Sequence, residues 1–314
     1  EHRRNREVNA LYRSSVLAVA NFRPLRSLIE RRGMQMGVRR FVAGEDFADA
    51  APAIDRLEEQ GFAVILDVLG EFVDNEAAAL QITENVIETV QRMASREHTK
   101  QLSVKLTQLG LGISKELGLN SMRRVAHAAR EAGVQVAMDM ENHPYIDATL
   151  EILETLHNEG YTNVSTVLQA YLHRTQEDLG RLLAMPSKPA VRIVKGAYKE
   201  PAAISYQQRS VISDKFHEMV VRTLEAGSYA NIATHDERLV ARASEYIEQN
   251  GVNRDQYEFQ MLYGVMPGLQ KRLLEQGHTV RIYVPFGQDW YGYFSRRLAE
   301  KPGNLAFVAR GLFG

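Results

Sequence analysis

Short apolar runs rich in β-branched residues alternate with longer amphipathic stretches from residue 62 onward. The stretches between the runs, such as SMRRVAHAAREAG (121–133) and DERLVARASEYIEQNG (236–251), have helical spacing and close on a glycine. Strands that alternate with helices are typical of βαβ units and a parallel sheet. The apolar runs lie at 62–70, 101–109, 134–141, 163–171, 190–198, 229–236, 257–264 and 279–287.

Eight strand–helix units in succession are the number that closes a (β/α)8 barrel of the TIM type. A doubly wound open sheet is the alternative, but the even spacing of the units favours closure. We therefore predict one barrel domain over residues 46–314, with a final helix that lies over the barrel mouth. Helical spacing at 11–22 and 24–43 predicts a helical lead over residues 1–45, whose polar first ten residues we expect to be flexible.

The composition narrows the class of protein. The 314 residues are 45% hydrophobic and 25% charged, with a formal net charge of −1, which fits a soluble globular protein. A nucleic-acid surface usually brings a strong basic excess, so we expect no nucleic-acid partner. The absence of cysteine excludes disulfides, thiolate metal sites and a cysteine nucleophile, and it fits a reducing compartment such as the cytoplasm. No apolar run reaches the roughly 18 residues of a membrane span, and no signal peptide is recognisable.

Polar residues gather toward the carboxyl ends of the apolar runs. In a (β/α)8 barrel these ends line the active-site mouth, so a polar residue on most strands favours an enzyme. Any one of them could instead point outward between the barrel and its helices. The residues are Glu71, Lys105, Asp139, Gln169, Lys195, Thr234, His235 and Gln260.

Several catalytic motifs are missing. GxxxxGK[ST] and HExxH do not occur, and LGLGIS lacks the last glycine of GxGxxG. A metal site built from Asp67, Asp139 and His235 would have a single histidine and carboxylates on separate strands, so we expect no metal. A Schiff-base lyase that uses Lys105 or Lys195 is a stronger alternative, because a strand lysine can be desolvated into a nucleophile.

The stretch YFSRRLAE (293–300) follows the last predicted strand. Tyr293, Arg296, Arg297 and Glu300 fall on one face of a helix, where the glutamate can pair with an arginine. Taken alone, the stretch is typical of a surface salt bridge worth roughly 0–1 kcal/mol. Its position beside the mouth favours a receptor for a carboxylate, because adjacent guanidiniums offer bidentate donors.

Each predicted strand and the final helix carries a distinctive motif. The motifs are DVLGE (67–71), SVKLTQLG (103–110), MDME (138–141), LQAYLHRT (168–175), RIVKGAY (192–198), ATHDE (233–237), EFQMLYG (258–264), RIYVPFG (281–287) and YFSRRLAE. Together they resemble the bacterial single-domain proline dehydrogenases, over nearly the whole chain from about residue 11. The resemblance implies FAD-dependent oxidation of L-proline to Δ1-pyrroline-5-carboxylate on a barrel that binds its dinucleotide without a Rossmann fingerprint.

The resemblance implies a non-covalent FAD across the barrel mouth. A cation beside the flavin offsets the negative charge that reduction leaves there, which suits Arg192 and Lys195. Gly196 would let the backbone approach the cofactor closely. The positions that match the family's flavin contacts are Gln169, Arg192, Val194, Lys195, Gly196, Ala197, Thr234, His235, Arg297 and Glu300.

The same resemblance assigns the substrate contacts. Arg296 and Arg297 would receive the proline carboxylate, and Glu71 would pair with Arg296 as a gate that excludes water. No histidine is placed as a base for the amine proton, so that role stays unassigned. The catalytic positions are Lys105, Asp139, Arg296, Arg297 and Glu300, and the substrate contacts add Tyr198, Leu262, Tyr283 and Tyr293.

The reduced flavin would need an electron acceptor. The resemblance implies a quinone at the membrane, so we expect a cytoplasmic protein that makes peripheral contact with the inner face of the cell membrane. The basic stretch 31–40 could make that contact. A non-catalytic binding barrel is the third interpretation, and the sequence leaves the oligomeric state open.

Overall fold

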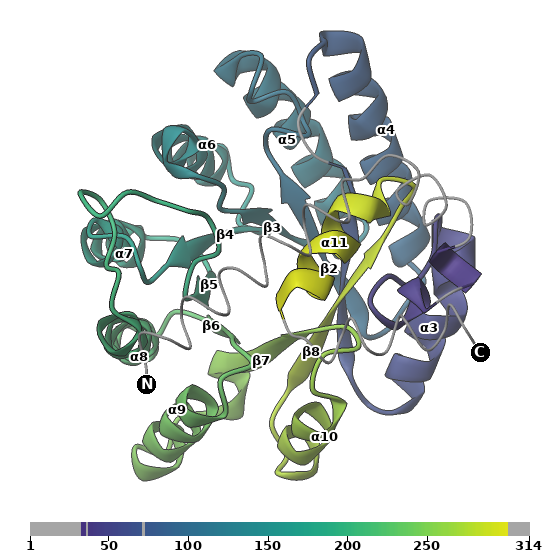
Figure 1. Ribbon diagram of the computed structural model, residues 1–314. Coiled ribbons are helices and arrows are strands. Elements are labelled where there is room, and N and C mark those ends of the chain that lie inside the picture. The colour runs from purple at the N-terminus through teal and green to yellow at the C-terminus, as the bar shows by residue number, and fades with distance from the viewer. Residues whose placement is uncertain (1–32, 36, 71–72, 301–314) are drawn as a thin grey trace.

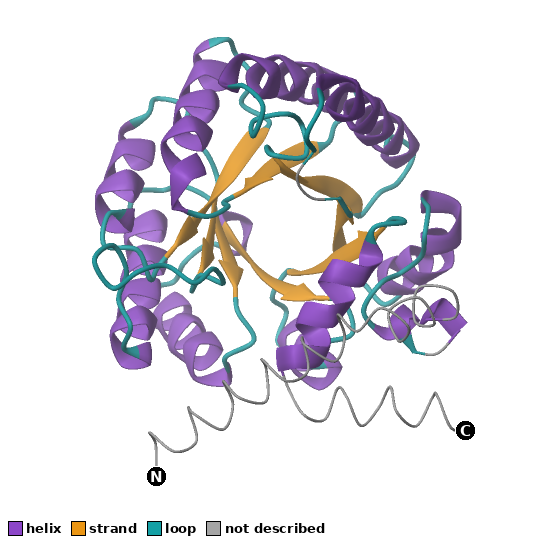
Figure 2. Cartoon of the chain, turned by 45° about the horizontal axis from the view of Figure 1, so that its top comes forward, coloured by secondary structure: helices purple, strands orange, loops and turns teal. Residues whose placement is uncertain are grey.

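Eight parallel strands form a closed barrel in the computed structural model, which describes residues 33–35, 37–70 and 73–300. Each strand pairs with the next along the chain, and β8 pairs with β1. Figure 2 shows the strands around the barrel axis with the helices outside them. The strands are β1 (Ala63–Val68), β2 (Thr99–Lys105), β3 (Gln135–Asp139), β4 (Val164–Gln169), β5 (Val191–Val194), β6 (Ala230–Ala233), β7 (Tyr257–Leu262) and β8 (Val280–Phe286). The predicted (β/α)8 barrel is confirmed.

Helices cover the outside of the barrel (Figure 1). Side-chain caps fix where several of them begin: the Asn75 side chain accepts from the Ala78 N–H at α4, and the Ser114 hydroxyl accepts from the Leu117 N–H at α5. Among the helices described, none has the length and apolar character that a membrane crossing requires. The helices are α3 (Phe47–Glu59), α4 (Glu76–Met93), α5 (Lys115–Glu131), α6 (Ile146–Asn158), α7 (Thr175–Ala184), α8 (Arg209–Glu225), α9 (Glu237–Gln249), α10 (Pro267–Glu275) and α11 (Trp290–Glu300), with short 3-10 turns η1 (Gly33–Gln35), η2 (Val38–Arg40), η3 (His143–Tyr145) and η4 (Arg254–Gln256).

The apolar runs extend past the carboxyl ends of the strands they predicted. The run 101–109 predicted a strand to Leu109, whereas β2 ends at Lys105 and the chain turns, with the Leu109 N–H bonded to the Lys105 carbonyl. Leu106 and Leu109 stay fully buried in this turn, so apolar character continues beyond strand pairing. Lys105, Asp139 and Gln169 are the last residues of β2, β3 and β4, so these polar residues lie at the mouth, whereas Gln260 lies within β7.

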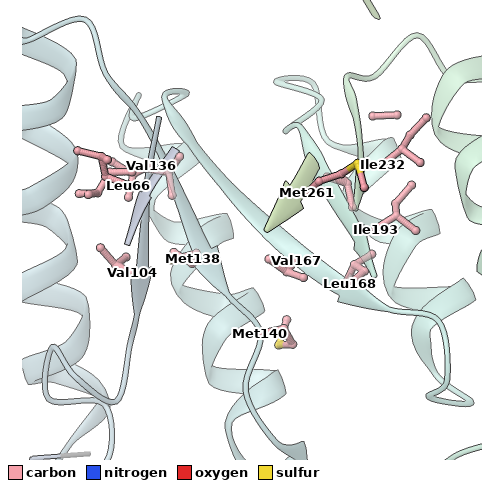
Figure 3. Packing of buried hydrophobic residues seen from close by; sticks show 14 of the residues in the cluster. Leu66, Val104, Val136, Met138, Met140, Val167, Leu168, Ile193, Ile232 and Met261 are labelled. Carbon is pink, nitrogen blue, oxygen red and sulfur yellow. The ribbon is translucent and has the colours of Figure 1, made fainter. Parts of the chain in front are cut away.

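The main hydrophobic core lies between the strands and the surrounding helices. Outward-facing strand side chains such as Leu66, Val104 and Val136 are buried there (Figure 3). Fully burying a side chain of this size contributes about 1.5–3 kcal/mol, so the layer fixes which face of each strand points outward. Alternation along β2 then directs Ser103 and Lys105 into the barrel interior.

A second buried cluster places α11 over the barrel mouth. The ring centroid of Phe294 lies 6.4 Å from that of Phe41 and 5.9 Å from that of Trp290. Leu69, which directly follows β1, belongs to the same cluster, so α11 packs at the carboxyl ends of the strands (Figure 1). The predicted final helix is confirmed.

The predicted helix over 24–43 is wrong in its described part. The described residues from 33 to 43 form only the short turns η1 and η2, because Gly37 between them adopts the left-handed region at a φ of 100°. The segment then joins the barrel, where the Ala43 N–H donates to the Pro285 carbonyl at 2.9 Å. The remainder of the predicted lead, residues 1–32, lies outside the described ranges.

Candidate active site

Three charged side chains meet inside the barrel at the carboxyl ends of β1, β2 and β3. Lys105 Nζ lies 3.2 Å from Asp139 Oδ2 and 3.4 Å from Asp67 Oδ1. The strand register brings them together, because Lys105 is the β2 partner of Asp139 and Asp67 faces Ser103 across β1 and β2. Asp67 is 1% exposed, so this ion-paired group is screened little by water.

Asp139 is the hub of the cluster. Its Oδ1 accepts from Arg192 Nη1 at 2.6 Å and from the Ser103 hydroxyl at 2.7 Å, and its Oδ2 accepts from the Tyr283 hydroxyl at 3.0 Å. The guanidinium carbon of Arg192 also lies 5.5 Å from the centroid of the Tyr283 ring. Charge-assisted bonds of this length hold both the carboxylate and its donors in one geometry.

Burial and charge act in opposite directions on the pKa values of the cluster. Burial raises the pKa of Asp67 above its usual range, against the effect of the Lys105 ammonium. Burial would raise the pKa of Asp139 as well, but the positive charges of Lys105 and Arg192 outweigh it and hold that pKa below its usual range. Burial would lower the pKa of Lys105, yet the negative charges around it, that of Asp67 first, raise it well above its usual value. At neutral pH Lys105 is therefore an ammonium and Asp139 a carboxylate.

The Schiff-base alternative is not favoured by this arrangement. A lysine nucleophile needs a lowered pKa so that its free amine can attack a carbonyl. Lys105 has a raised pKa between two carboxylates. Lys195, the other candidate, forms an ion pair with Asp236, with Nζ 2.5 Å from Oδ2.

Polar side chains at the ends of β4 and β6 are held by nearby backbone. The Gln169 amide nitrogen donates to the Glu141 carbonyl at 3.0 Å, and His235 Nε2 accepts from the Leu262 N–H at 2.9 Å. A backbone N–H can only donate, so the lone pair of that ring nitrogen is occupied and is not offered to a metal. The Thr234 hydroxyl oxygen accepts from the Asp236 N–H at 3.1 Å.

Gly196, just after β5, is explained by its neighbour Tyr171. It adopts a φ of 111°, and a Cβ built on it would lie 2.2 Å from a carbon of the Tyr171 ring. Only glycine combines that backbone conformation with such a close ring contact. The expected close approach of a cofactor stays a prediction, since the ring already requires a glycine here.

The arginine pair lies on α11 beside the mouth. The guanidinium carbon of Arg297 is 5.0 Å from the centroid of the Tyr293 ring, and both arginines are partly buried. Glu71, predicted to form the gate with Arg296, and the side chain of Glu300 lie outside what the structure describes. Their roles stay predictions.

A sequence model described as "Proline dehydrogenase" matches residues 50–310. The chain belongs to the proline dehydrogenase family. It is 41% identical over 309 residues to "Proline dehydrogenase" of Deinococcus radiodurans, covering 97% of this chain and 99% of that protein. It is 36% identical over 302 residues to "Proline dehydrogenase 1" of Bacillus subtilis, covering 96% of this chain and 99% of that protein. The resemblance inferred from the motifs is confirmed.

A longer proline utilization A protein with a solved structure has the same fold. It comes from Bdellovibrio bacteriovorus and was crystallised after inactivation by N-propargylglycine. The TM-score is 0.79 at 24% sequence identity, with 93% of this chain covered. The present chain spans 37% of that longer chain, and at this identity the likeness supports the barrel alone.

In this member of the proline dehydrogenase family, the predicted site residues fall into three groups. Lys105, Asp139, Arg192 and Tyr283 are brought together in one hydrogen-bonded cluster. The second group sits at strand ends and in the loop after β5, where Ala197 and Tyr198 are exposed; it comprises Gln169, Val194, Lys195, Gly196, Ala197, Tyr198, Thr234, His235 and Leu262. The third is on α11, with Tyr293, Arg296 and Arg297.

The assignment from motifs gave no place in the site to Asp67 or Ser103. Both bond directly to the predicted residues Lys105 and Asp139. A signal was present, because Ser103 lies two residues before Lys105 and so shares its face of β2. A carboxylate in the apolar run FAVILDVLG is a comparable signal for Asp67, since an ion in a buried strand needs a partner.

Proposed function

We propose that this protein oxidises L-proline to Δ1-pyrroline-5-carboxylate with FAD as hydride acceptor, and that a quinone then receives the electrons. The observation that carries the proposal is the ion-paired, largely enclosed Lys105–Asp139–Arg192 cluster at the barrel mouth of a chain in this family. Fixed charges at the carboxyl ends of barrel strands are typical of a catalytic site. The relatives named above supply the reaction class.

The residues present fit a flavin in one testable respect. Arg192 is 5% exposed, and its Nη2 has no hydrogen-bond partner among the described residues. A buried guanidinium nitrogen without an acceptor is costly, so an acceptor atom of a bound group would complete the site. When bound, FAD would supply the hydride-accepting chemistry. Residues that would hold it with Arg192 are Gln169, Val194, Lys195, Gly196, Ala197, Thr234, His235, Arg297 and Glu300.

The substrate would bind between α11 and the cluster. Arg296 and Arg297 would receive the carboxylate of L-proline, because guanidiniums bind carboxylates through paired donors. A small apolar ring needs walls that exclude water. Those walls would be the side chains of Tyr198, Leu262, Tyr283 and Tyr293.

The raised pKa of Lys105 limits what this residue can do. As an ammonium it offers protons in hydrogen bonds and stabilises negative charge, but it is no base for the substrate amine. We therefore propose that Lys105 and Asp139 orient the substrate and fix the electrostatic field at the reacting carbon. The amine proton is left without an assigned acceptor.

The proposal extends to access and to the electron acceptor. Glu71 would close the site by pairing with Arg296 once substrate is bound, which keeps water from the reaction. A quinone acceptor lies in the membrane, so the protein would work in the cytoplasm with peripheral contact at the inner face of the cell membrane. The basic stretch 31–40 is the candidate contact.

Visible absorption of the purified protein tests the proposal. We expect bound FAD whose absorption is bleached by L-proline in the absence of oxygen. Borohydride treatment in the presence of substrate should leave no adduct on Lys105 or Lys195. A colourless protein that takes up no FAD, or a flavoprotein that L-proline does not reduce, would contradict the proposal.

A further inference from the structure

Gln260 lies in the middle of β7, deeper in the barrel than the charged cluster. It is 3% exposed, and its Oε1 accepts from Arg192 Nε at 2.7 Å. Its Nε2 is surrounded by three acceptors: Glu258 Oε1 at 2.6 Å, Gln101 Oε1 at 2.9 Å and Asn231 Oδ1 at 3.2 Å. Acceptors on one side and a guanidinium on the other leave a single orientation for the amide.

The layer beneath Gln260 is anchored by an ion pair. Arg281 Nε lies 2.7 Å from Glu258 Oε1, and Arg281 Nη1 donates to the Val64 carbonyl at 3.1 Å. Glu258 is 1% exposed, and its second oxygen accepts from the Tyr229 hydroxyl at 3.3 Å. Glu258, which accepts from the Gln260 amide, is thus itself held by its bonds to Arg281 and Tyr229. These connected bonds make the layer rigid.

The network leaves one edge of the Arg192 guanidinium for another group. Nε is bonded to Gln260, and Nη1 is bonded to Asp139 and to the Ser103 hydroxyl. Because a guanidinium is planar, fixing two of its nitrogens fixes the third. The third is Nη2, the buried nitrogen without a partner among the described residues.

The geometry points to Gln260 as a positioning residue that aims Arg192 Nη2 at the flavin and so sets the flavin's reduction potential. This inference rests on the proposed flavin function. A cation held against the site of developing negative charge stabilises the reduced cofactor, and a cation that can swing away stabilises it less. Gln260 would act through Arg192 alone and would touch neither substrate nor cofactor.

The chemistry of the position requires an amide. A carboxylate at 260 would put a second negative charge next to Glu258, whose Oε1 is 2.6 Å from the present amide nitrogen. A hydrocarbon at 260 would leave Arg192 Nε buried without an acceptor. Glutamine alone accepts from Arg192 and donates to Glu258 with one side chain of this length.

The test compares Gln260→Met with Gln176→Met. Gln176 Oε1 accepts from Arg222 Nη1 at 2.5 Å between α7 and α8, so the control also removes an amide–arginine bond, but outside the barrel. We expect the two-electron potential of FAD in Gln260→Met to fall by about 30 mV, the equivalent of a tenfold weaker preference for reduced flavin. We expect kcat to fall about tenfold while the KM for L-proline changes less than about twofold. Gln176→Met should keep the wild-type potential and kcat.

A double variant separates positioning from an independent effect. If Gln260 acts through Arg192, then Gln260→Met should shift the potential little further in an Arg192→Lys background. Fully additive shifts, or a wild-type potential in Gln260→Met, would overturn the inference. Should Gln260→Met fail to bind FAD, the shorter amide in Gln260→Asn is measured in the same way, with the same expected direction. A wild-type protein that binds no flavin contradicts the proposed function, whereas flavin with an unchanged potential in the variants contradicts only this inference.

Discussion

The Tyr283 hydroxyl donates a 3.0 Å hydrogen bond to Asp139 Oδ2, which joins β8 to β3 across the barrel interior. Asp139 Oδ2 also lies 3.2 Å from Lys105 Nζ. Asp139 therefore has donors on both oxygens, and its carboxylate cannot turn without breaking a charge-assisted bond. The cluster around Asp139 therefore presents its charges in one fixed geometry to a molecule that binds at the mouth.

Replacing Tyr283 by phenylalanine tests that rigidity. Tyr283→Phe removes one donor from the partly buried Asp139 carboxylate, which should cost about 1–3 kcal/mol in transition-state binding and lower kcat/KM for L-proline accordingly. Steady-state kinetics measure this. The control is Tyr246→Phe, which removes a 3.3 Å hydrogen bond to Glu225 at the exposed surface. Equal kcat/KM in Tyr283→Phe and wild type would mean that the hydroxyl does not orient the carboxylate.

Lys105 can be tested through its two carboxylates. Lys105→Met leaves the buried Asp67 without its counter-ion and removes one of the two counter-ions of the partly buried Asp139, which should cost up to about 3–5 kcal/mol of unfolding free energy. Adding Asp67→Asn removes the carboxylate charge that Lys105 no longer neutralises, so the double variant should be more stable than Lys105→Met alone. Urea unfolding of all variants gives the coupling energy. Additive changes would show that Lys105 does not compensate the charge of Asp67.

The arginine pair gives a prediction on substrate binding. Arg297→Met should lose roughly 2–5 kcal/mol of substrate or transition-state binding, as expected when the partner of a buried charge is removed. The control Arg242→Met breaks an ion pair to Asp214 at 2.7 Å on the exposed surface of α9 and should leave kinetics unchanged. The measurement is kcat/KM for L-proline. A variant that keeps wild-type kcat/KM would exclude Arg297 as a carboxylate receptor.

The fold could be predicted because the spacing of apolar residues within each strand and helix is a property of that segment alone. Burial repeats every second residue along a strand and every third or fourth along a helix, so eight units are visible without knowledge of their contacts. The end of a strand is less visible, as Leu106 and Leu109 show, because burial continues into the turn after pairing has stopped. In the described part of the predicted 24–43 helix, the left-handed backbone conformation of Gly37 separates two short turns, and hydrophobic spacing does not report such a conformation.

The interior of the barrel could be predicted only in part. The pattern assigns Gln260 to the mouth, whereas Arg281, Glu258 and Gln260 form a polar layer deeper in the barrel. Which side chains meet across a closed barrel depends on strand tilt and stagger, and spacing within one strand does not fix these. Arg192 was assigned from a motif, but its bonds to Asp139 and Gln260 become visible only when β3, β5 and β7 surround one axis.

The contact between Gly196 and Tyr171 gives a prediction on stability. Gly196→Ala should cost the strain of a non-glycine residue at positive φ, about 1–2 kcal/mol, plus about 1–3 kcal/mol for the clash with the ring. Gly133→Ala is the matched control, because Gly133 also has a positive φ, 65°, but nothing lies within 4 Å of a Cβ there. Urea unfolding should therefore show a larger loss for Gly196→Ala. Equal losses would mean that the ring moves aside without cost.

His157 predicts how stability depends on pH. Its Nε2 lies 2.7 Å from the Val164 carbonyl and therefore carries the proton, while Nδ1 accepts from the Ser187 hydroxyl at 2.7 Å. Burial lowers the pKa of His157, although the bond to the carbonyl acts against this. The neutral ring is thus the form that folding selects, whereas the unfolded chain takes up a proton below its ordinary pKa of about 6.5.

The sign of the effect follows from this difference in proton uptake. The stability contributed by neutral His157 is fully present above pH of about 6.5 and is lost as the pH falls toward the lower folded-state pKa, by at most about 1.4 kcal/mol per pH unit. The glutamine in His157→Gln cannot titrate. Between pH 6.5 and pH 5 the free energy of unfolding of this variant should therefore fall less steeply than that of the wild type, by up to about 1.4 kcal/mol per pH unit. Ser187→Ala removes the hydrogen bond but keeps the imidazole, so it should lower stability while retaining the wild-type slope. If His157→Gln and wild type have the same slope in urea titrations, proton uptake by His157 does not contribute to acid destabilisation.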